Sequence, residues 1–125
     1  MQYYAHSNGT NDKNKWQTLE EHLMNVAELT EEFASKFGVN GIGYNIGLFH
    51  DIGKSQENMI KRLSGENIKV VHSSGGAQSL EEYMSNKSLL KMCQEVIASH
   101  HGGLKNFGLS TDVDNGTTYA MLNKN

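Results

Sequence analysis

The sequence predicts an all-α protein folded as a compact helical bundle. Two observations favour this fold class: apolar residues recur at helical spacing along most of the chain, and long alternation of polar and apolar residues is absent. "NIKVVH", residues 67–72, is the only strand candidate. A chain of 125 residues suits one hydrophobic core, and we therefore expect a single domain spanning residues 1–125.

The clearest helix follows Thr18, in "TLEEHLMNVAELTEEFASKFG". Thr18 suits the N-cap, and Glu21 follows at the spacing of a capping box. Gly38 suits the left-handed residue that commonly ends a helix. The residues expected to form the buried stripe are Leu19, Leu23, Val26, Ala27, Thr30, Phe33, Ala34 and Phe37.

A second helix is predicted from about Gly41 to Ile52, with Gly53 ending it. Glycine in a helix costs roughly 1 kcal/mol relative to alanine, and this helix contains several. Contacts with the rest of the fold must therefore hold it. The residues expected to face the core are Ile42, Ile46, Leu48, Phe49 and Ile52.

Four further helices complete the prediction. Their expected bounds are Ser55–Leu63, Gly76–Ser85, Ser88–His100 and Thr117–Leu122. Ser55 and Ser88 are the expected N-caps of two of them. Gly102 and Gly103 are expected to end the helix that reaches His100. The core stripe expected on that helix is Leu89, Leu90, Cys93, Val96 and Ile97.

Composition narrows the classes of function. The net charge is −3 and Arg62 is the single arginine, so we expect no broad basic surface and few bidentate phosphate contacts. A nucleic acid substrate would be held by a metal or by a partner protein. The lone cysteine, Cys93, excludes an internal disulfide and is expected in the core. No long apolar run or signal pattern is visible, so we expect a cytoplasmic protein without a membrane partner.

Histidines are the unusual feature of the chain. His50 stands beside Asp51 in "GLFHDIGK", and the other candidates are His22, His72, His100 and His101. One such histidine alone is more often a hydrogen-bonded core residue. Their accumulation from four segments favours metal ligation, because imidazole and carboxylate together suit divalent transition metals. A set without thiolates is typical of catalytic rather than structural sites.

Five histidines and one aspartate exceed the needs of one four-coordinate ion. They suit two ions that share Asp51 as a bridge. The expected cofactors are one or two divalent transition-metal ions. The candidate metals are Mn, Ni, Co, Fe and Zn, and Mg is a further candidate. Lys54, one turn after Asp51, is a candidate for stabilising charge that develops on a phosphate. The alternative for Lys54 is a solvated lysine at a helix end.

The ordered pattern of these residues resembles the HD superfamily of metal-dependent phosphohydrolases. More narrowly, it looks like the CRISPR-associated HD nuclease, which accompanies or is fused to the type I interference helicase. The segments that carry the resemblance are "YYAHS", "WQTLEEHLMNVA", "GLFHDIGK", "VVHSSGGA" and "SHHGGL". Together these segments span nearly the whole chain.

The resemblance implies an all-α HD-domain bundle that cleaves single-stranded DNA with the help of metal ions, in antiviral defence. The metal ligands that it implies are His22, His50, Asp51, His72, His100 and His101. It also implies catalytic roles for Asp51 and Lys54, with His6 and Ser7 in support. The implied partners are single-stranded DNA, a separate CRISPR-associated helicase and a DNA-targeting complex.

The chain departs from this family in one respect. Members usually supply a further aspartate from a helix well downstream of the paired histidines. Here only Asp112 and Asp114 follow His101, in "TDVDNG", where a role in a turn is the alternative. We therefore expect either a domain truncated at its C-terminus or a minimal version of the domain.

Two other functions stay open from the sequence. One is an HD phosphohydrolase of nucleotides or cyclic dinucleotides. The cyclic-dinucleotide branch usually has an acidic residue and a Gly-Tyr-Pro motif after the paired histidines, whereas this chain reads "HHGGLKNFGL" and has no proline. The other is a degenerate HD bundle that binds metal or a partner without cleaving anything.

Overall fold

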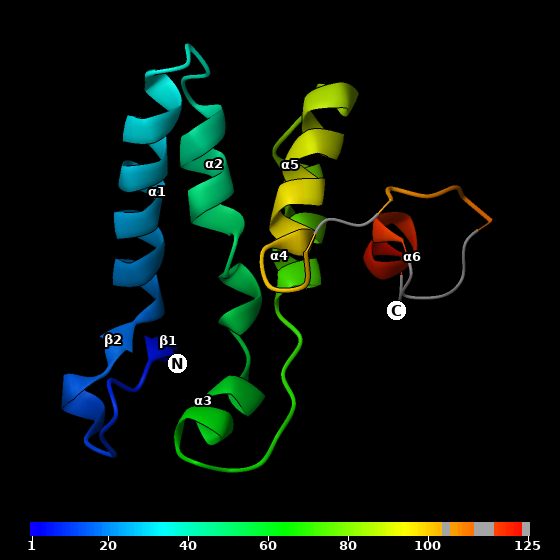
Figure 1. Cartoon of the computed structure of the whole chain (residues 1–125). Helices are drawn as coiled ribbons and strands as arrows, with labels where there is room; N and C mark the ends of the chain where they lie inside the picture. Colours follow the sequence, from blue (N-terminus) through cyan, green and yellow to red (C-terminus); the bar gives the residue numbers. More distant parts are fainter. Residues whose placement is uncertain (104–105, 112–116, 124–125) are drawn as a thin grey trace.

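The computed structural model describes residues 1–103, 106–111 and 117–123, and these form a mostly helical protein (Figure 1). The α-helices are α1 (Leu19–Ser35), α2 (Ile42–Phe49), α3 (Glu57–Leu63), α4 (Ser73–Ser79), α5 (Lys87–Ser99) and α6 (Thr118–Leu122). The 3-10 turns are η1 (Lys13–Lys15), η2 (Ile52–Lys54) and η3 (Leu80–Glu82), and the strands are β1 (Tyr4–His6) and β2 (Gln17–Thr18). The predicted all-α fold class is confirmed, with one minor two-stranded ribbon added to it.

Helices α1 and α2 lie side by side and run in opposite directions (Figure 1). The predicted cap of α1 is confirmed, because the Thr18 hydroxyl accepts a hydrogen bond from the Glu21 backbone N–H at 3.2 Å. Gly38 follows α1 with a φ of +74°, a conformation that glycine adopts without a steric penalty. Both ends of α1 are therefore set by residues, Thr18 and Gly38, whose roles could be predicted from the sequence.

Glycines on α2 allow its backbone to approach α1 closely. A Cβ atom on Gly43 would lie 2.5 Å from the Ala34 Cβ and 2.5 Å from the Thr30 carbonyl oxygen. The Thr30 hydroxyl also donates a hydrogen bond to the Gly43 carbonyl at 2.6 Å. The tertiary support expected for this glycine-rich helix is thus its contact with α1.

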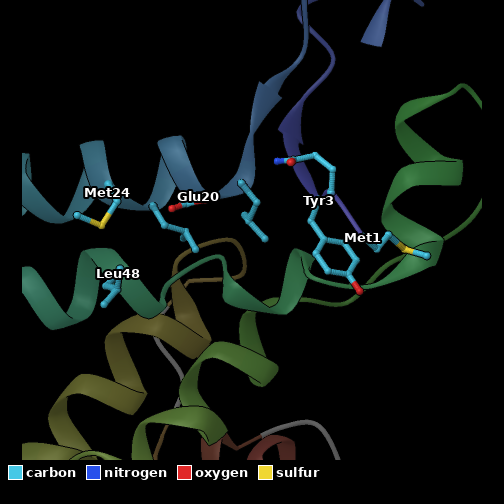
Figure 2. A pocket seen from close by; sticks show the side chains of 8 residues that line it. Met1, Tyr3, Glu20, Met24 and Leu48 are labelled. Atoms are coloured by element: carbon cyan, nitrogen blue, oxygen red, sulfur yellow. The ribbon is translucent and has the colours of Figure 1, made fainter. Parts of the chain in front are cut away.

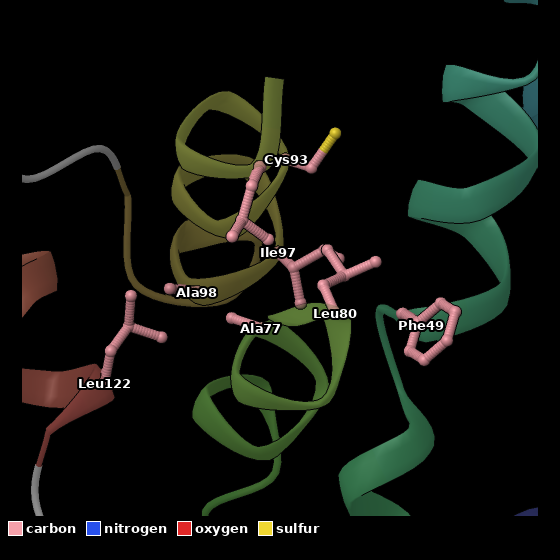
Figure 3. Packing of buried hydrophobic residues seen from close by; sticks show 8 residues of the cluster. Phe49, Ala77, Leu80, Cys93, Ile97, Ala98 and Leu122 are labelled. Carbon is pink, nitrogen blue, oxygen red and sulfur yellow. The ribbon is translucent and has the colours of Figure 1, made fainter. Parts of the chain in front are cut away.

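The main core lies where α2, α4, α5 and α6 meet. Figure 3 shows side chains of this core, which come from these helices and from η3. The buried members of this core are Phe49, Ala77, Leu80, Leu90, Cys93, Ile97, Ala98 and Leu122. A smaller cluster of Ala5, Leu19 and Leu23 joins β1 to the start of α1. Cys93 is a buried free cysteine, as expected.

Part of the predicted core stripe is wrong. Phe33 and Phe37 are 54% and 84% exposed, and Val96 on α5 is 45% exposed. Helix α2 contacts the side of α1 that carries Ala27 and Thr30, which leaves the neighbouring flank with Phe33 uncovered. A wide apolar stripe in the sequence therefore includes one flank that the fold does not bury.

The chain leaves α2 earlier than predicted, at Phe49 instead of Ile52. Asp51 has φ −116° and ψ +11°, outside helical geometry, and η2 then begins at Ile52. The backbone of α4 comes so close at this point that a Cβ on Gly76 would lie 2.1 Å from the Phe49 carbonyl oxygen. This close contact fixes the end of α2 against α4.

Other boundaries also differ from the prediction. Helix α4 begins at Ser73, three residues before the predicted Gly76, and it ends at Ser79, where η3 follows. Gln56, not Ser55, is the residue before α3. Asn86 caps α5 in place of Ser88, because its side-chain oxygen accepts from the backbone N–H groups of the first turn. The predicted last helix is confirmed, with its cap at Thr117.

The two strands lie where no strand was predicted. β1 and β2 pair antiparallel, with Tyr4 opposite Thr18 and His6 opposite Gln17. The strand candidate "NIKVVH" adopts neither helix nor strand. Within the described part of the chain, no helix combines the length and the apolar character needed to cross a lipid bilayer.

Replacing Gly43 by alanine should destabilise the fold by about 1–3 kcal/mol, because the added methyl group overlaps α1. Urea denaturation in the presence of EDTA measures this loss without a contribution from metal. Gly102→Ala is the matched control, since nothing lies within 4 Å of a Cβ at that position. Equal stability of the two variants would contradict the close α1–α2 contact.

Candidate metal centre

The predicted ligands come from segments that meet at one end of the bundle (Figure 1). His22 lies in α1 near its start, and His50 is the C-cap of α2. His72 is the N-cap of α4, and His100 is the C-cap of α5. Three of these histidines are helix caps, so the ends of three helices bring residues from separate parts of the sequence together here.

One oxygen of the Asp51 carboxylate faces the α1 side of the site. Oδ2 lies 3.0 Å from the Nε2 atom of His22 and 3.2 Å from that of His50. The Lys54 ammonium contacts the same oxygen at 3.0 Å. Asp51 itself is buried, with 4% of its surface exposed.

The other carboxylate oxygen faces α4 and α5. Oδ1 lies 3.2 Å from the His72 Nε2 atom and 3.3 Å from the His100 Nε2 atom. The His101 Nε2 atom lies 2.8 Å from that of His72. Asp51 therefore lies between two groups of imidazoles.

These contacts define two ligand sets that share Asp51. Set 1 is His22, His50 and Asp51. Set 2 is Asp51, His72, His100 and His101. Within each set the ligand atoms lie within 4.8 Å of one another, which is close enough to hold one ion.

The protonation of two rings tests whether the sites fit a metal. His50 Nδ1 lies 2.6 Å from the Gly47 carbonyl oxygen, and His100 Nδ1 lies 2.6 Å from that of Ile97. A carbonyl oxygen only accepts, so Nδ1 carries the proton in both rings and a neutral ring directs the Nε2 lone pair at Asp51. Lone pairs repel at this distance unless a cation lies between them.

A divalent ion resolves this repulsion better than protons do. Protonating every imidazole would place five positive rings around one carboxylate. A transition metal instead accepts several imidazole and carboxylate lone pairs at once. The donor set therefore fits a divalent metal, and it has the nitrogen-rich, thiolate-free character of catalytic sites.

The comparison with family models agrees with this geometry. The HD domain model matches residues 19–121, a range that contains both ligand sets. The chain belongs to the HD domain family. No curated protein and no solved structure matches the chain. HD domains are generally metal-dependent hydrolases, and the cluster around Asp51 supplies the metal-binding chemistry that this activity requires.

Electrostatics favour an ionised Asp51 and neutral rings at His22 and His101. Burial raises the pKa of Asp51, but the positive charge of Lys54 and the protons that His100, His50 and His72 can carry without a metal outweigh it and hold that pKa well below its usual range. Burial lowers the pKa of His22 and of His101, which favours the neutral ring that binds metal. Without a metal the pKa of His100 is raised, chiefly by its hydrogen bond to Asp51, so an ion that binds there displaces a proton.

Lys54 is a buried residue of the HD site, so the alternative of a solvated helix-end lysine is wrong. Its side chain is 7% exposed, and Nζ contacts Asp51 and, at 3.4 Å, the Ala5 carbonyl oxygen. A buried ammonium needs such partners, because the interior does not solvate charge. The β1 strand thereby helps to hold the lysine against the carboxylate.

The two supporting residues lie differently. The His6 ring packs edge-on against the His22 ring, with 5.0 Å between ring centroids. Burial, followed by the charge of Lys54, lowers the pKa of His6. Ser7 follows β1, and its carbonyl accepts the Thr10 N–H. Within the described residues its side chain makes no hydrogen bond to either ligand set, and its supporting role stays a prediction.

Sequence reasoning missed the backbone groups of the HD site. The carbonyls of Gly47 and Ile97 each accept from the histidine three residues later. A signal was available, because both histidines were predicted at or near helix ends, where the ring can reach back to a carbonyl. Asp112 and Asp114, the candidates for a further ligand, lie outside the described residues.

A separate apolar cavity of about 330 Å³ lies between the N-terminal residues, α1 and α2 (Figure 2). Met1, Tyr3, Met24 and Leu48 line it together with Glu20. None of the lining residues belongs to either ligand set. This cavity is therefore separate from the candidate metal centre.

Variants of single ligands should separate the two sets. Asp51→Asn should lose both ions, because the amide removes the shared charge, whereas His22→Ala and His101→Ala should each lose about one. Elemental analysis of purified protein measures the stoichiometry. Glu66→Gln, on an exposed residue outside both sets, is the control. Unchanged metal content in Asp51→Asn would contradict the shared carboxylate.

Metal should also stabilise the fold, because its ligands come from four separate segments. A metal at 100 times its dissociation constant adds about 2.7 kcal/mol to the free energy of unfolding. Thermal denaturation with manganese and with EDTA measures the difference. The gain should shrink in Asp51→Asn, and an equal gain in that variant would show that the metal binds elsewhere.

Proposed function

We propose that the protein is a metal-dependent phosphodiesterase and, more narrowly, a nuclease that cleaves single-stranded DNA. The observation that carries the proposal is the Asp51 carboxylate shared by two ligand sets. Paired ions held in this way suit in-line displacement at a phosphodiester, where both the attacking and the leaving oxygen need stabilisation.

The residues of the chain have separate tasks in this reaction. Ions held by the two ligand sets would supply an activated water and would offset charge on the phosphate. Asp51 fixes the two sets relative to each other, because each of its oxygens faces a different set. Gly47 and Ile97 hold the rings of His50 and His100 in the tautomer that binds through Nε2.

Lys54 keeps Asp51 in place and adds positive charge on the side of set 1. Its ammonium contacts the oxygen that faces His22 and His50. In that position it would offset negative charge that develops on a phosphate bound between the sets. Because Lys54 is buried, water and dissolved ions do not compete for its ammonium as they would at the surface.

The charge of the chain supports dependence on a partner. The net charge is −3, and α1 carries five glutamates with no lysine or arginine. Non-specific binding of DNA rests on neutralising phosphates with basic side chains. We propose that a separate CRISPR-associated helicase and a DNA-targeting complex deliver the strand, as the motif resemblance implies.

The test is cleavage of circular single-stranded DNA by the purified protein with Mn, Ni, Co or Mg. We expect nicking with at least one transition metal and none with EDTA. Asp51→Ala should reduce cleavage by at least about 1,000-fold, since it removes the shared ligand. Glu66→Gln should cleave like the unchanged protein.

Three results would redirect or overturn the proposal. Release of phosphate from nucleotides with DNA untouched would favour a nucleotide phosphohydrolase. Bound metal without turnover of either substrate would show a non-catalytic HD domain. Cleavage by Asp51→Ala at the unchanged rate would show a contaminating enzyme or a different site.

A further inference from the structure

A cavity opens directly beside set 2 of the metal centre. Its volume is about 320 Å³, in the range of small-ligand pockets. His72 and His101 form one part of its lining, so the cavity is continuous with the ligands themselves. The other lining residues are Arg62, Val70, Val71 and Ser73.

Arg62 is the group in this cavity that points to a ligand. It is the single arginine of the chain and lies in the last turn of α3. No ion pair joins its guanidinium to a carboxylate in the part of the chain that the structure describes. An unpaired guanidinium beside a metal centre is suited to bidentate binding of a phosphate.

The remaining lining suits the rest of a nucleotide. Val71 is 59% exposed and Val70 is buried, and both give the cavity that Arg62 lines an apolar part. Ser73 is buried, and its hydroxyl has no hydrogen bond within the described residues. A sugar or base would contact the valines while the hydroxyl and Arg62 bind oxygen atoms.

We propose that this cavity binds the nucleotide next to the scissile phosphodiester, with Arg62 paired to the phosphate of that nucleotide. The inference rests on the proposed function and specifies its substrate. The site would prefer an oligonucleotide, which carries a phosphate one unit away from the bond that is cut. A small phosphodiester without that second phosphate would leave Arg62 without a partner.

The test is binding of a thymidine dinucleotide to the metal-loaded protein, used as the whole 125-residue chain. Its linkage is a methylphosphonate, which replaces the scissile phosphodiester and prevents cleavage during the measurement. Three versions of this probe are compared: one with a phosphate at its 5′ end, one with a phosphate at its 3′ end, and one without a terminal phosphate. Calorimetry or NMR titration gives the dissociation constants, and elemental analysis confirms equal metal content.

One of the two phosphorylated probes should bind at least about tenfold more tightly than the unphosphorylated one, as a charged hydrogen bond provides. Arg62→Ala should abolish this difference, and Arg62→Lys should restore part of it, because lysine keeps the charge but loses the bidentate geometry. Lys61→Ala is the matched control. It removes one charge from the same exposed turn without touching the cavity lining.

Equal loss of affinity in Lys61→Ala and Arg62→Ala would overturn the proposal, because it would show diffuse charge attraction. Equal binding of all three probes to the unchanged protein would overturn it as well. The readout is separate from cleavage. A protein that binds the phosphorylated probe through Arg62 but cuts no DNA would contradict the proposed nuclease and support the proposed nucleotide cavity. A protein that cuts DNA but binds all three probes equally would support the nuclease and contradict the cavity.

Discussion

The Asp51 carboxylate carries the contacts on which the rest of the site depends. Four imidazoles and one ammonium lie within 3.3 Å of its two oxygens. A buried carboxylate stays ionised only when such partners replace the water it has lost. The contacting side chains come from α1, α2, η2, α4 and α5, or from their caps. The bundle is therefore organised around a buried anion whose partners come together only in the folded chain.

Close contacts between backbones bring these groups into range. A Cβ on Gly47 would lie 2.7 Å from the Ala27 Cα, and one on Gly53 would lie 2.1 Å from the His72 carbonyl oxygen. Gly76 approaches the Phe49 carbonyl just as closely. Each contact lies within a few residues of a proposed ligand, so the absence of a side chain there sets where the neighbouring histidine is held. These glycines lower the helix propensity of their segments, but they allow the close backbone contacts that position the histidines.

Much of the fold and of the candidate site follows from local sequence signals. The cap at Thr18, the stop at Gly38 and the grouping of the histidines were all visible, because each depends on residues close in sequence or on chemistry of a known type. The β1–β2 ribbon was not visible, since it is very short and its strands lack polar–apolar alternation. The exposure of Phe33 and the burial of Lys54 could not be predicted from local sequence signals either. Both depend on which flank of a helix a distant segment covers, and helical periodicity does not contain that information.

Cys93 has a practical consequence for studying this molecule in solution. The thiolate is the reactive form of cysteine, and burial both raises the pKa of this thiol and shields it from solvent. It is also the only cysteine in the chain. Thiol-directed spin labels or fluorophores attached at a newly introduced surface cysteine would therefore report from that one place. A pair of introduced cysteines would likewise give the distance between the bundle ends without first removing the native thiol.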